Sequence, residues 1–285
     1  MDESKTLRKE HADYTMEIFL DPYNRRVRID DYQGNITKII TESETIAKEN
    51  NAEKLIIKSR IEQFGTLIEY GFRCEGRIGG YFLGSNCLFF SKFYSSDRKE
   101  SNHWLKEEAI MSSVSLLERQ SNYVHPPTQY LLKKMGVKDA TRLAKLYQQV
   151  FQIYPTPLNK PDYIKKTMQE GTIYYGFECD GEIVSAASAE VNLFYKNAEL
   201  TDCATLTEHR KYGLMKILLI RLEKELKEKG IYCSYSIARS LSFGMNAALH
   251  QLGYRYQGRL INNCYIYDKL EDMNVWVRDL SLNST

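Results

Sequence analysis

The chain has 285 residues, of which 43% are hydrophobic and 27% charged, so it is long enough for one large or two modest domains with buried cores. Its 39 basic and 37 acidic residues leave a formal net charge of +2, a balance that argues against a nucleic-acid-binding protein. The longest apolar runs, at 87–90 and 217–220, are far shorter than the roughly 20 residues of a membrane span. The charged start has no apolar segment of the signal-peptide type, and six dispersed cysteines indicate reduced thiols. We therefore expect a cytoplasmic protein with no metal, no nucleic-acid partner and no membrane association.

Hydrophobic periodicity and turn residues predict the elements of the first part of the chain. In chain order, these are short strands over 13–35, a helix over 36–51, a strand over 52–60, a short helix over 61–70, a strand pair over 72–94 and a helix near 103–120. The stretch 121–130 contains paired prolines, which favour an extended linker. We place a domain boundary near residue 124, so that the two predicted domains are 1–124 and 125–285.

The second part of the chain predicts an α/β protein with a mixed sheet, in the order β-α-α-β-β-β-α-β-α-β-β. The expected elements are a strand over 130–135, helices over 137–151 and 160–170, strands over 172–179, 182–194 and 198–206, a helix over 213–230, a strand over 231–239, a helix over 240–252 and a final hairpin over 254–270. The helix over 213–230 has the most regular apolar spacing of the chain.

One eight-residue phrase occurs twice: residues 71–78 read GFRCEGRI and residues 253–260 read GYRYQGRL. A helix, a strand and a second helix precede each copy, and the second helix is shorter in the first copy. We therefore predict that the N-terminal region is a truncated copy of the second half of the C-terminal domain. A chance similarity of two hairpins that open on glycine is the alternative.

The segment RKYGLM at 210–215 lies where a strand stops and the most regular helix begins. The first N–H groups of a helix lack partners inside it and carry the positive end of its dipole, so such a turn suits an anion, diphosphates especially. Gly213 permits close approach of the backbone, and Arg210 and Lys211 add positive charge. An ordinary solvated helix start is the alternative.

The order of elements and the sequence over 198–226 resemble the GNAT superfamily of acetyl-CoA-dependent N-acyltransferases, and the resemblance covers roughly 130–270. It implies a GNAT acyltransferase fold preceded by a truncated, degenerate GNAT-like half-domain, with acetyl-CoA as cosubstrate. The family writes its pyrophosphate loop [RQ]-x-x-G-x-[GA], which implies that Arg210, Lys211, Tyr212, Gly213, Leu214 and Met215 bind the cofactor. Met215 replaces the small last residue of that motif, which should shift the cofactor slightly or reshape the loop.

The resemblance also implies that Cys203, Ala204 and Thr205 pair their backbone with pantetheine and that one amide there is an oxyanion hole; a plain core strand is the alternative. The attacking amine must be neutral, and deprotonating a lysine-like ammonium at neutral pH costs roughly 4 kcal/mol, so a general base is useful. Glu199 occupies the place of the base in the histone-acetyltransferase branch. Asp202 comes three residues after Glu199, and side chains alternate along a strand, so the two carboxylates should face opposite sides unless the strand bulges.

Many members of the superfamily protonate the leaving thiolate with a tyrosine on the next helix, but Leu249 stands at that place. We expect Tyr265 to substitute, with Tyr267 as the other candidate, and a packed strand residue is the alternative for each. Asn246 is expected to contact the CoA arm or to cap its helix locally.

The whole-chain layout resembles the beta-lysine N6-acetyltransferase family, which implies transfer of acetyl to the side-chain amine of beta-lysine to give the osmolyte N6-acetyl-beta-lysine. Such a substrate needs acidic groups near its second ammonium, for which Glu190, Asn192 and Asp202 are candidates, and an arginine or lysine for its carboxylate. Two alternatives remain: a GNAT enzyme for another amine, such as a polyamine or a protein lysine, and a CoA-binding regulator without catalysis.

The N-terminal copy lacks both the phosphate loop and the base, so we expect it to bind no CoA. It could extend the sheet, wall the substrate pocket or occupy a surface that would otherwise dimerise. The sequence does not choose among these roles, or between a monomer and a homodimer.

Overall fold

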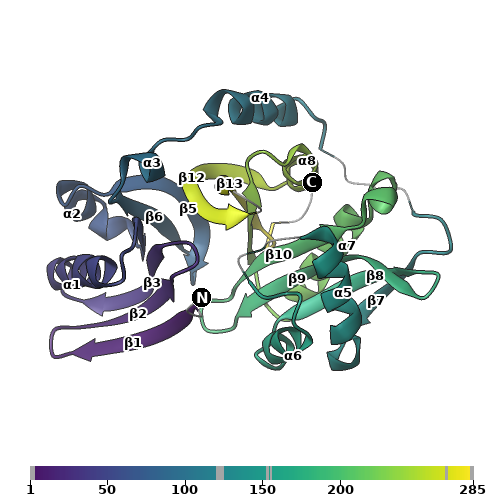
Figure 1. Cartoon of the computed structure of the whole chain (residues 1–285), viewed down its shortest axis with the longest axis horizontal. Helices are drawn as coiled ribbons and strands as arrows, with labels where there is room; N and C mark the ends of the chain where they lie inside the picture. Colours follow the sequence, from purple (N-terminus) through teal and green to yellow (C-terminus); the bar gives the residue numbers. More distant parts are fainter. Residues whose placement is uncertain (1–3, 120–124, 152–153, 155, 267–268, 283–285) are drawn as a thin grey trace.

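The computed structural model describes residues 4–119, 125–151, 154, 156–266 and 269–282. Its strands form one 13-stranded sheet in the order β1-β2-β3-β4-β6-β5-β12-β13-β11-β10-β9-β8-β7, with the N-terminal strands at one end and the C-terminal domain at the other (Figure 1). The predicted boundary near residue 124 lies outside the described residues. Within them, no helix is long and apolar enough to cross a membrane.

The elements of the N-terminal half are β1 Lys5–His11, β2 Tyr14–Asp21, β3 Arg26–Gly34, α1 Ile36–Glu49, β4 Lys54–Ser59, η1 Ile61–Gln63, α2 Phe64–Glu69, β5 Arg73–Phe82, β6 Ser85–Phe93, α3 Ser96–Lys99 and α4 Trp104–Ser115. Strand β1 was not expected, because KTLRKEH is polar and all seven of its residues are exposed. It pairs on one side only, with β2, and its charged side chains suit a strand at the edge of a sheet.

The elements of the C-terminal half are β7 Leu131–Met135, η2 Val137–Asp139, α5 Ala140–Val150, α6 Pro161–Gln169, β8 Ile173–Cys179, β9 Glu182–Asn192, β10 Asn197–Thr205, η3 Thr207–Tyr212, α7 Leu214–Glu228, β11 Cys233–Arg239, α8 Phe243–Gln251, β12 Arg255–Ile266 and β13 Lys269–Asp279. The predicted order of strands and α-helices is confirmed. The final hairpin is longer than predicted, because β13 continues to Asp279. Its buried polar residues Glu271, Asp272 and Asn274 obscure the strand pattern in the sequence.

The two halves share one pattern of strand pairing. Strand β3 runs parallel to β4, as β10 runs parallel to β11. Strand β4 then pairs with the second strand of the β5–β6 hairpin, as β11 pairs with the second strand of the β12–β13 hairpin. Because β1 and β2 also precede β3 as β8 and β9 precede β10, the repeat extends beyond the second half of the C-terminal domain that the sequence predicts.

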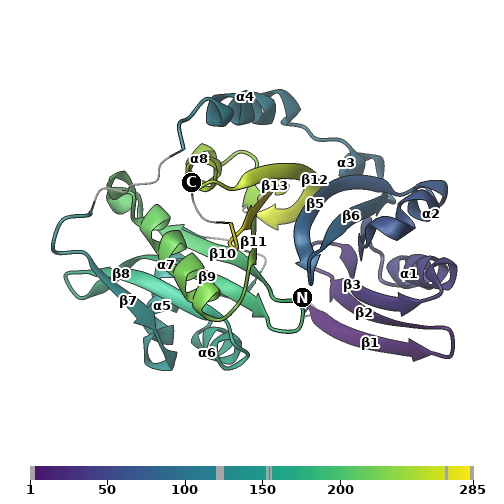
Figure 2. The same cartoon turned by 180° about the vertical axis from the view of Figure 1, so that it is seen from behind.

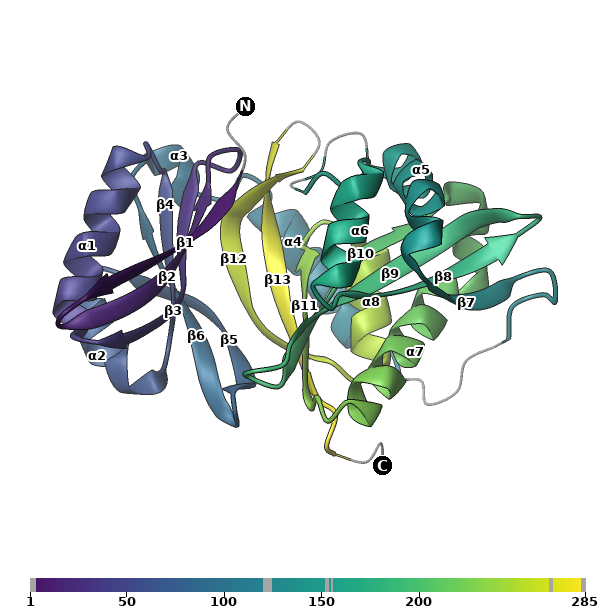
Figure 3. The same ribbon diagram turned by 90° about the horizontal axis from the view of Figure 1, so that it is seen from below.

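Helices cover the sheet differently in the two halves. In the C-terminal half, α5 and α6 pack on one face and α7 and α8 on the other (Figure 3). In the N-terminal half, α1 and α2 cover one face, and the other face packs against β11, β12 and β13 through residues such as Phe89, Tyr235 and Val275. Helix α4 lies across both halves, as the view from behind also shows (Figure 2), and its Glu107 forms a buried ion pair with Arg259 (3.4 Å).

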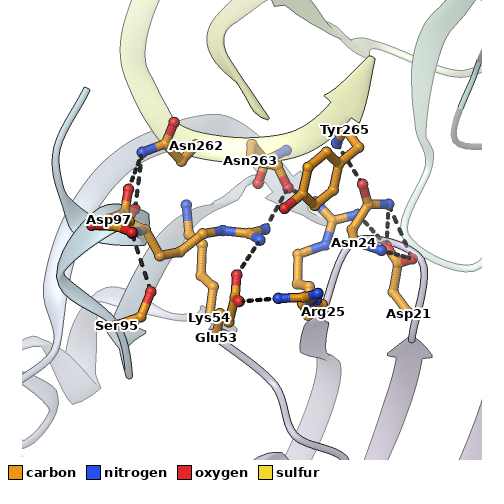
Figure 4. Close-up of polar contacts among 12 residues, drawn as sticks. Asp21, Asn24, Arg25, Glu53, Lys54, Ser95, Asp97, Asn262, Asn263 and Tyr265 are labelled. Atoms are coloured by element: carbon orange, nitrogen blue, oxygen red, sulfur yellow. Dashed lines mark hydrogen bonds and ion pairs between the residues drawn. The ribbon is translucent and has the colours of Figure 1, made fainter. Parts of the chain in front are cut away.

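Polar side chains of the N-terminal half hydrogen-bond to the backbone of β12 (Figure 4). The Asn24 side chain accepts the backbone N–H of Tyr265 (2.7 Å), and the Arg26 guanidinium donates to the carbonyl of Asn263 (3.0 Å). A register shift between Leu260 and Cys264 leaves Asn263 outside the regular ladder with β13, whereas Tyr265 lies opposite Leu270 in it. The contacts satisfy buried backbone groups that would otherwise destabilise the junction.

The contacts across the junction come in equivalent pairs. Arg26 begins β3 and Asn197 begins β10, each at the first registered position of its parallel strand pair. The Asn197 side chain donates to the carbonyl of Tyr81 (2.8 Å), as Arg26 donates to that of Asn263. Tyr81 and Asn263 are as many residues apart as the two copies of the repeated phrase. The halves are therefore related by an approximate two-fold operation and not only by sequence.

Candidate active site

The parallel pairing of β10 with β11 is short. It runs only from Asn197 opposite Cys233 to Glu199 opposite Tyr235, although both strands continue. Just beyond, the Ser236 hydroxyl donates to the carbonyl of Leu200 (2.8 Å), so a side chain replaces the ladder there. The edge of β10 that faces β11 is therefore open at the place where the sequence predicts pantetheine to bind.

The predicted pantetheine residues lie on this part of β10. On the other side of the strand, Ala204 pairs with Ala186 and Thr205 with Ser185 of β9. Cys203 packs partly against the core beneath α7, and burial raises the pKa of its thiol, so it is no ready nucleophile. The strand can thus offer backbone groups toward β11 while β9 holds its opposite edge.

The predicted phosphate loop forms η3 and the start of α7. Gly213 has a φ of 65°, a left-handed conformation that favours glycine, and α7 begins at the next residue. Because glycine brings no side chain to this position, no side-chain cap closes the N-terminus of the helix. Arg210 donates to the carbonyl of Thr205 (3.1 Å), and Met215 packs against the core and not across the loop. These features fit a diphosphate.

Three carboxylates gather beside the open edge of β10. Glu199 lies directly opposite Glu190 of β9 in the register of the two strands. The sequence predicts that the carboxylates of Glu199 and Asp202 face opposite sides unless the strand bulges. Strand β10 is irregular between Thr201 and Ala204, where Asp202 has a φ of 50°. Its carboxylate accepts a hydrogen bond from Ser188 (2.7 Å).

The environment raises the pKa of all three carboxylates. Burial, followed by the charges of Glu199 and Asp202, raises the pKa of Glu190 to about 8. Burial also raises the pKa of Asp202 to about 6, and the Glu199 charge adds to that shift. The pKa of Glu199 is raised by burial as well, against the opposing effects of Lys58, Arg28 and a hydrogen bond from Tyr235. A carboxylate with a raised pKa is a stronger proton acceptor in the neutral range.

Glu199 lines a cavity of about 870 Å³ that both halves of the chain enclose. The C-terminal half contributes α6, β9, β10 and β11, and the N-terminal half contributes β2, β3 and β4. Charged and tyrosine side chains of this wall include Glu17, Arg28, Asp30, Lys58, Tyr81, Tyr163, Glu190, Glu199 and Tyr235. The N-terminal half therefore both extends the sheet and walls the cavity.

The other predicted substrate residues lie near Glu199. Asn192 lines the cavity, and its side chain accepts the backbone N–H of Tyr195 (2.9 Å) in the turn between β9 and β10. Asp202 is buried outside the lining and acts on the site through its charge. Glu190 lines the cavity directly.

Tyr265 and Asn246 do not join this group. The Tyr265 ring lies against Tyr23 (6.2 Å between centroids), while its neighbour Cys264 faces the cluster that contains Tyr235. Tyr265 is thus absent from the described lining of the cavity, and Tyr267 lies outside the described residues.

Asn246 is fully buried, so its contact with the CoA arm stays a prediction that its surroundings do not favour. Its side chain donates to the carbonyls of Arg239 and Ser242 and accepts from Asn274 and Trp276. All of its hydrogen-bonding capacity serves the fold, in agreement with the local alternative.

Several cavity residues were not predicted. Arg28, Asp30 and Lys58 come from a half of the chain in which the sequence offers no catalytic motif. Tyr163 and Tyr235 resemble the many packed tyrosines of the chain. A signal for Arg28 exists only once β3 is aligned with β10, because it then matches Glu199. Among the described residues, no three His, Cys, Asp or Glu side chains are placed to hold a metal ion.

The site thus combines a parallel strand pair that opens beside an uncapped, glycine-led helix with a carboxylate at the opening. Residues 141–254 match the Acetyltransferase (GNAT) family. The chain is 38% identical over 260 residues to N-acetyltransferase YodP of Bacillus subtilis (strain 168), covering 91% of this chain and 94% of the relative.

Two further relatives carry the name beta-lysine N(6)-acetyltransferase. The one from Methanococcus maripaludis is 34% identical over 265 residues, covering 92% of this chain and 95% of the relative. The one from Methanosarcina mazei is 35% identical over 270 residues, covering 88% and 100%. The chain belongs to the GNAT family of acetyltransferases.

Proposed function

We propose that the protein transfers an acetyl group from acetyl-CoA to the N6 amine of beta-lysine, giving N6-acetyl-beta-lysine. The observation that carries the proposal is the position of Glu199, which lies at the opening between β10 and β11 and at the wall of a cavity with mixed charge. The two relatives named beta-lysine N(6)-acetyltransferase support the choice of amine.

Residues of this chain fit acetyl-CoA. The uncapped N-terminus of α7, with Gly213 in the left-handed conformation, would hold the diphosphate, together with Arg210 and Lys211. The open edge of β10 at Cys203, Ala204 and Thr205 would hold the pantetheine arm. Acetyl-CoA supplies the acetyl thioester when it is bound.

Glu199 takes the proton that the substrate ammonium must lose before its nitrogen can attack. The nitrogen then forms a bond to the acetyl carbon and gives its second proton to solvent as the bond from that carbon to sulfur breaks, so the products are an amide, a thiolate and a released proton. Because a thiol has a pKa near 8.5, the thiolate can leave without an acid from the protein. We therefore assign no acid, and Tyr265 remains a prediction that this cavity does not favour.

Release of CoA in the steady state, with acetyl-CoA and a panel of amines, tests this function. The panel is lysine, beta-lysine, spermidine and a lysine-containing peptide. We expect strong selectivity for beta-lysine and acetylation at N6 in the product. Turnover of another amine would contradict the substrate and retain the reaction. Tight binding of acetyl-CoA with no turnover of any amine would favour the non-catalytic regulator.

A further inference from the structure

Arg28 occupies in the N-terminal copy the position that Glu199 occupies in the C-terminal copy. Each residue comes two positions after the first registered residue of its strand, Arg28 opposite Ile56 and Glu199 opposite Tyr235. Both line the same cavity, and their charges interact, since Glu199 helps to raise the pKa of Arg28. The two-fold relation thus places a cation and a carboxylate at equivalent positions around one cavity.

The N-terminal wall of the cavity carries three basic residues, Arg8, Arg28 and Lys58, and three acidic residues, Glu17, Asp30 and Asp31. Asp30 accepts two hydrogen bonds from the Arg28 guanidinium (2.5 and 2.9 Å) and also pairs with Lys58 (2.8 Å). Two cations therefore share one carboxylate. The guanidinium also lies over the ring of Phe19 (4.8 Å), which fixes its position.

The other two carboxylates of this wall, Asp31 and Glu17, do not pair with Arg28 and Lys58 as Asp30 does. Asp31 pairs with Arg60 (3.5 Å) and accepts a hydrogen bond from Tyr195 (2.5 Å). Glu17 is exposed and lines the cavity. Partial burial and the charges of Asp30 and Asp31 raise its pKa, and Lys58 and Arg28 lie close enough to oppose that rise. The wall thus presents two cations and one exposed carboxylate side by side.

The N-terminal copy cannot hold CoA as the C-terminal copy can. The side chain of Asn35 caps α1 by accepting the N–H of Lys38 (3.1 Å), whereas Gly213 leaves the equivalent end of α7 without a side-chain cap. The copy is therefore free of the cofactor and available to the second ligand.

We propose that the N-terminal copy holds the amino-acid end of the substrate, with Arg28 and Lys58 at the carboxylate and Glu17 at the adjacent ammonium, while Glu199 receives the amine to be acetylated. A beta-amino acid carries its carboxylate and ammonium close together, and the distal amine at the far end of a flexible chain. Because Asp30 already accepts from Nε and Nη2 of Arg28, the Nη1 group of Arg28 and the Lys58 ammonium remain for the substrate carboxylate, and a paired cation and carboxylate match a zwitterion. This inference rests on the proposed function, since it assigns the remaining part of the same substrate.

Three substrates separate the contribution of Arg28, at the carboxylate, from that of Glu17, at the adjacent ammonium. These are beta-lysine, its primary amide, which keeps both amines and loses the carboxylate charge, and 6-aminohexanoate, which keeps the carboxylate and loses the second amine. We expect Arg28→Gln to lower kcat/KM for beta-lysine about 10²-fold, mainly through KM, and to change that for the amide less than about threefold. Glu17→Gln should lower kcat/KM for beta-lysine and the amide alike and leave that for 6-aminohexanoate unchanged.

Arg25→Gln is the matched control, because Arg25 lies outside the described lining of the cavity, is 61% exposed and pairs with Glu53. It should leave all three substrates within about twofold of wild type. The Kd of acetyl-CoA should not change in any variant. If Arg28→Gln does not fold, Glu17→Gln still decides, since Glu17 is exposed and its loss leaves no buried charge unpaired.

Equal losses on beta-lysine and its amide with Arg28→Gln, or no effect of Glu17→Gln, would overturn the inference and leave the proposed function standing. Failure of the wild type to acetylate beta-lysine would overturn both.

Discussion

Gly76 lies directly opposite Gly258, where β5 meets β12 and the two halves of the sheet join. The two glycines hold the same place in the two copies of the repeated phrase. A Cβ atom at Gly258 would lie 2.3 Å from the carbonyl oxygen of Glu75 and 2.5 Å from the Cα of Gly76. The two copies of the repeated sequence therefore contact each other in the fold, and the glycine of each copy lets the two backbones approach closely.

We therefore expect Gly258→Ala to destabilise the protein by about 3 kcal/mol, since the new methyl group meets backbone and the φ of +135° disfavours a side chain. Gly65→Ala is the control, because nothing lies within 4 Å of a Cβ there, and alanine should stabilise α2 slightly. Thermal and urea unfolding of both variants measure the effect. Equal stabilities would show that the junction does not depend on close backbone approach.

Gly213 tests the phosphate site. Gly213→Val should raise the Kd of acetyl-CoA about tenfold or more, because a branched side chain disfavours the left-handed conformation and stands where a diphosphate must approach. Gly230→Val is matched, since Gly230 has a similar φ (+69°) beyond the other end of α7. Both variants should lose comparable stability, and only Gly213→Val should weaken binding in titration calorimetry. The same Kd of acetyl-CoA in Gly213→Val and Gly230→Val would mean that the diphosphate does not bind at this loop.

Lys58 lowers the proton affinity of Glu199 through its opposite charge. Lys58→Gln removes that charge, so the pKa of Glu199 should rise and the acidic limb of kcat should move to higher pH. Lys145→Gln is the control, because Lys145 is exposed and pairs with the exposed Glu182 at the surface. A profile that does not move in Lys58→Gln would mean that Glu199 is not the titrating base.

Glu190→Gln changes the pH dependence of stability. The pKa of Glu190 is raised from about 4.3 in an unfolded chain to about 8 in the fold, so the folded state binds the proton more tightly. The associated stability is complete below about pH 4 and is lost as pH rises through about 8. Wild type should therefore lose more of its Tm between pH 5 and 9 than Glu190→Gln does. Equal losses would contradict the raised pKa.

Local signals explain which features the sequence could predict. Helix α7 and Gly213 are readable because apolar spacing and a glycine at the helix start are properties of one short segment. Glu199 is readable from its place on the strand before that segment. Arg28 is not, because its role depends on the order of strands in the sheet, which places β3 beside a site built by the other half.

Side-chain direction explains why Tyr265 and Asn246 lie apart from the residues around Glu199. Tyr265 belongs to the correct hairpin, but strand alternation turns it toward Tyr23, and the face that it takes follows from the register of β12 with its neighbours. Asn246 belongs to the predicted helix, but two of its four hydrogen bonds join it to Asn274 and Trp276, which lie far along the chain. Strand β1 has no hydrophobic alternation and forms only because β2 offers an edge.

The most direct test of the central claim is the steady-state kcat of Glu199→Gln with acetyl-CoA and beta-lysine at neutral pH, beside Glu182→Gln. Glutamine keeps the shape of the side chain and cannot accept the proton. The account predicts a loss of about 10²- to 10⁴-fold in kcat with an unchanged KM for acetyl-CoA, and a normal rate for Glu182→Gln. A kcat within about threefold of wild type in Glu199→Gln would contradict it.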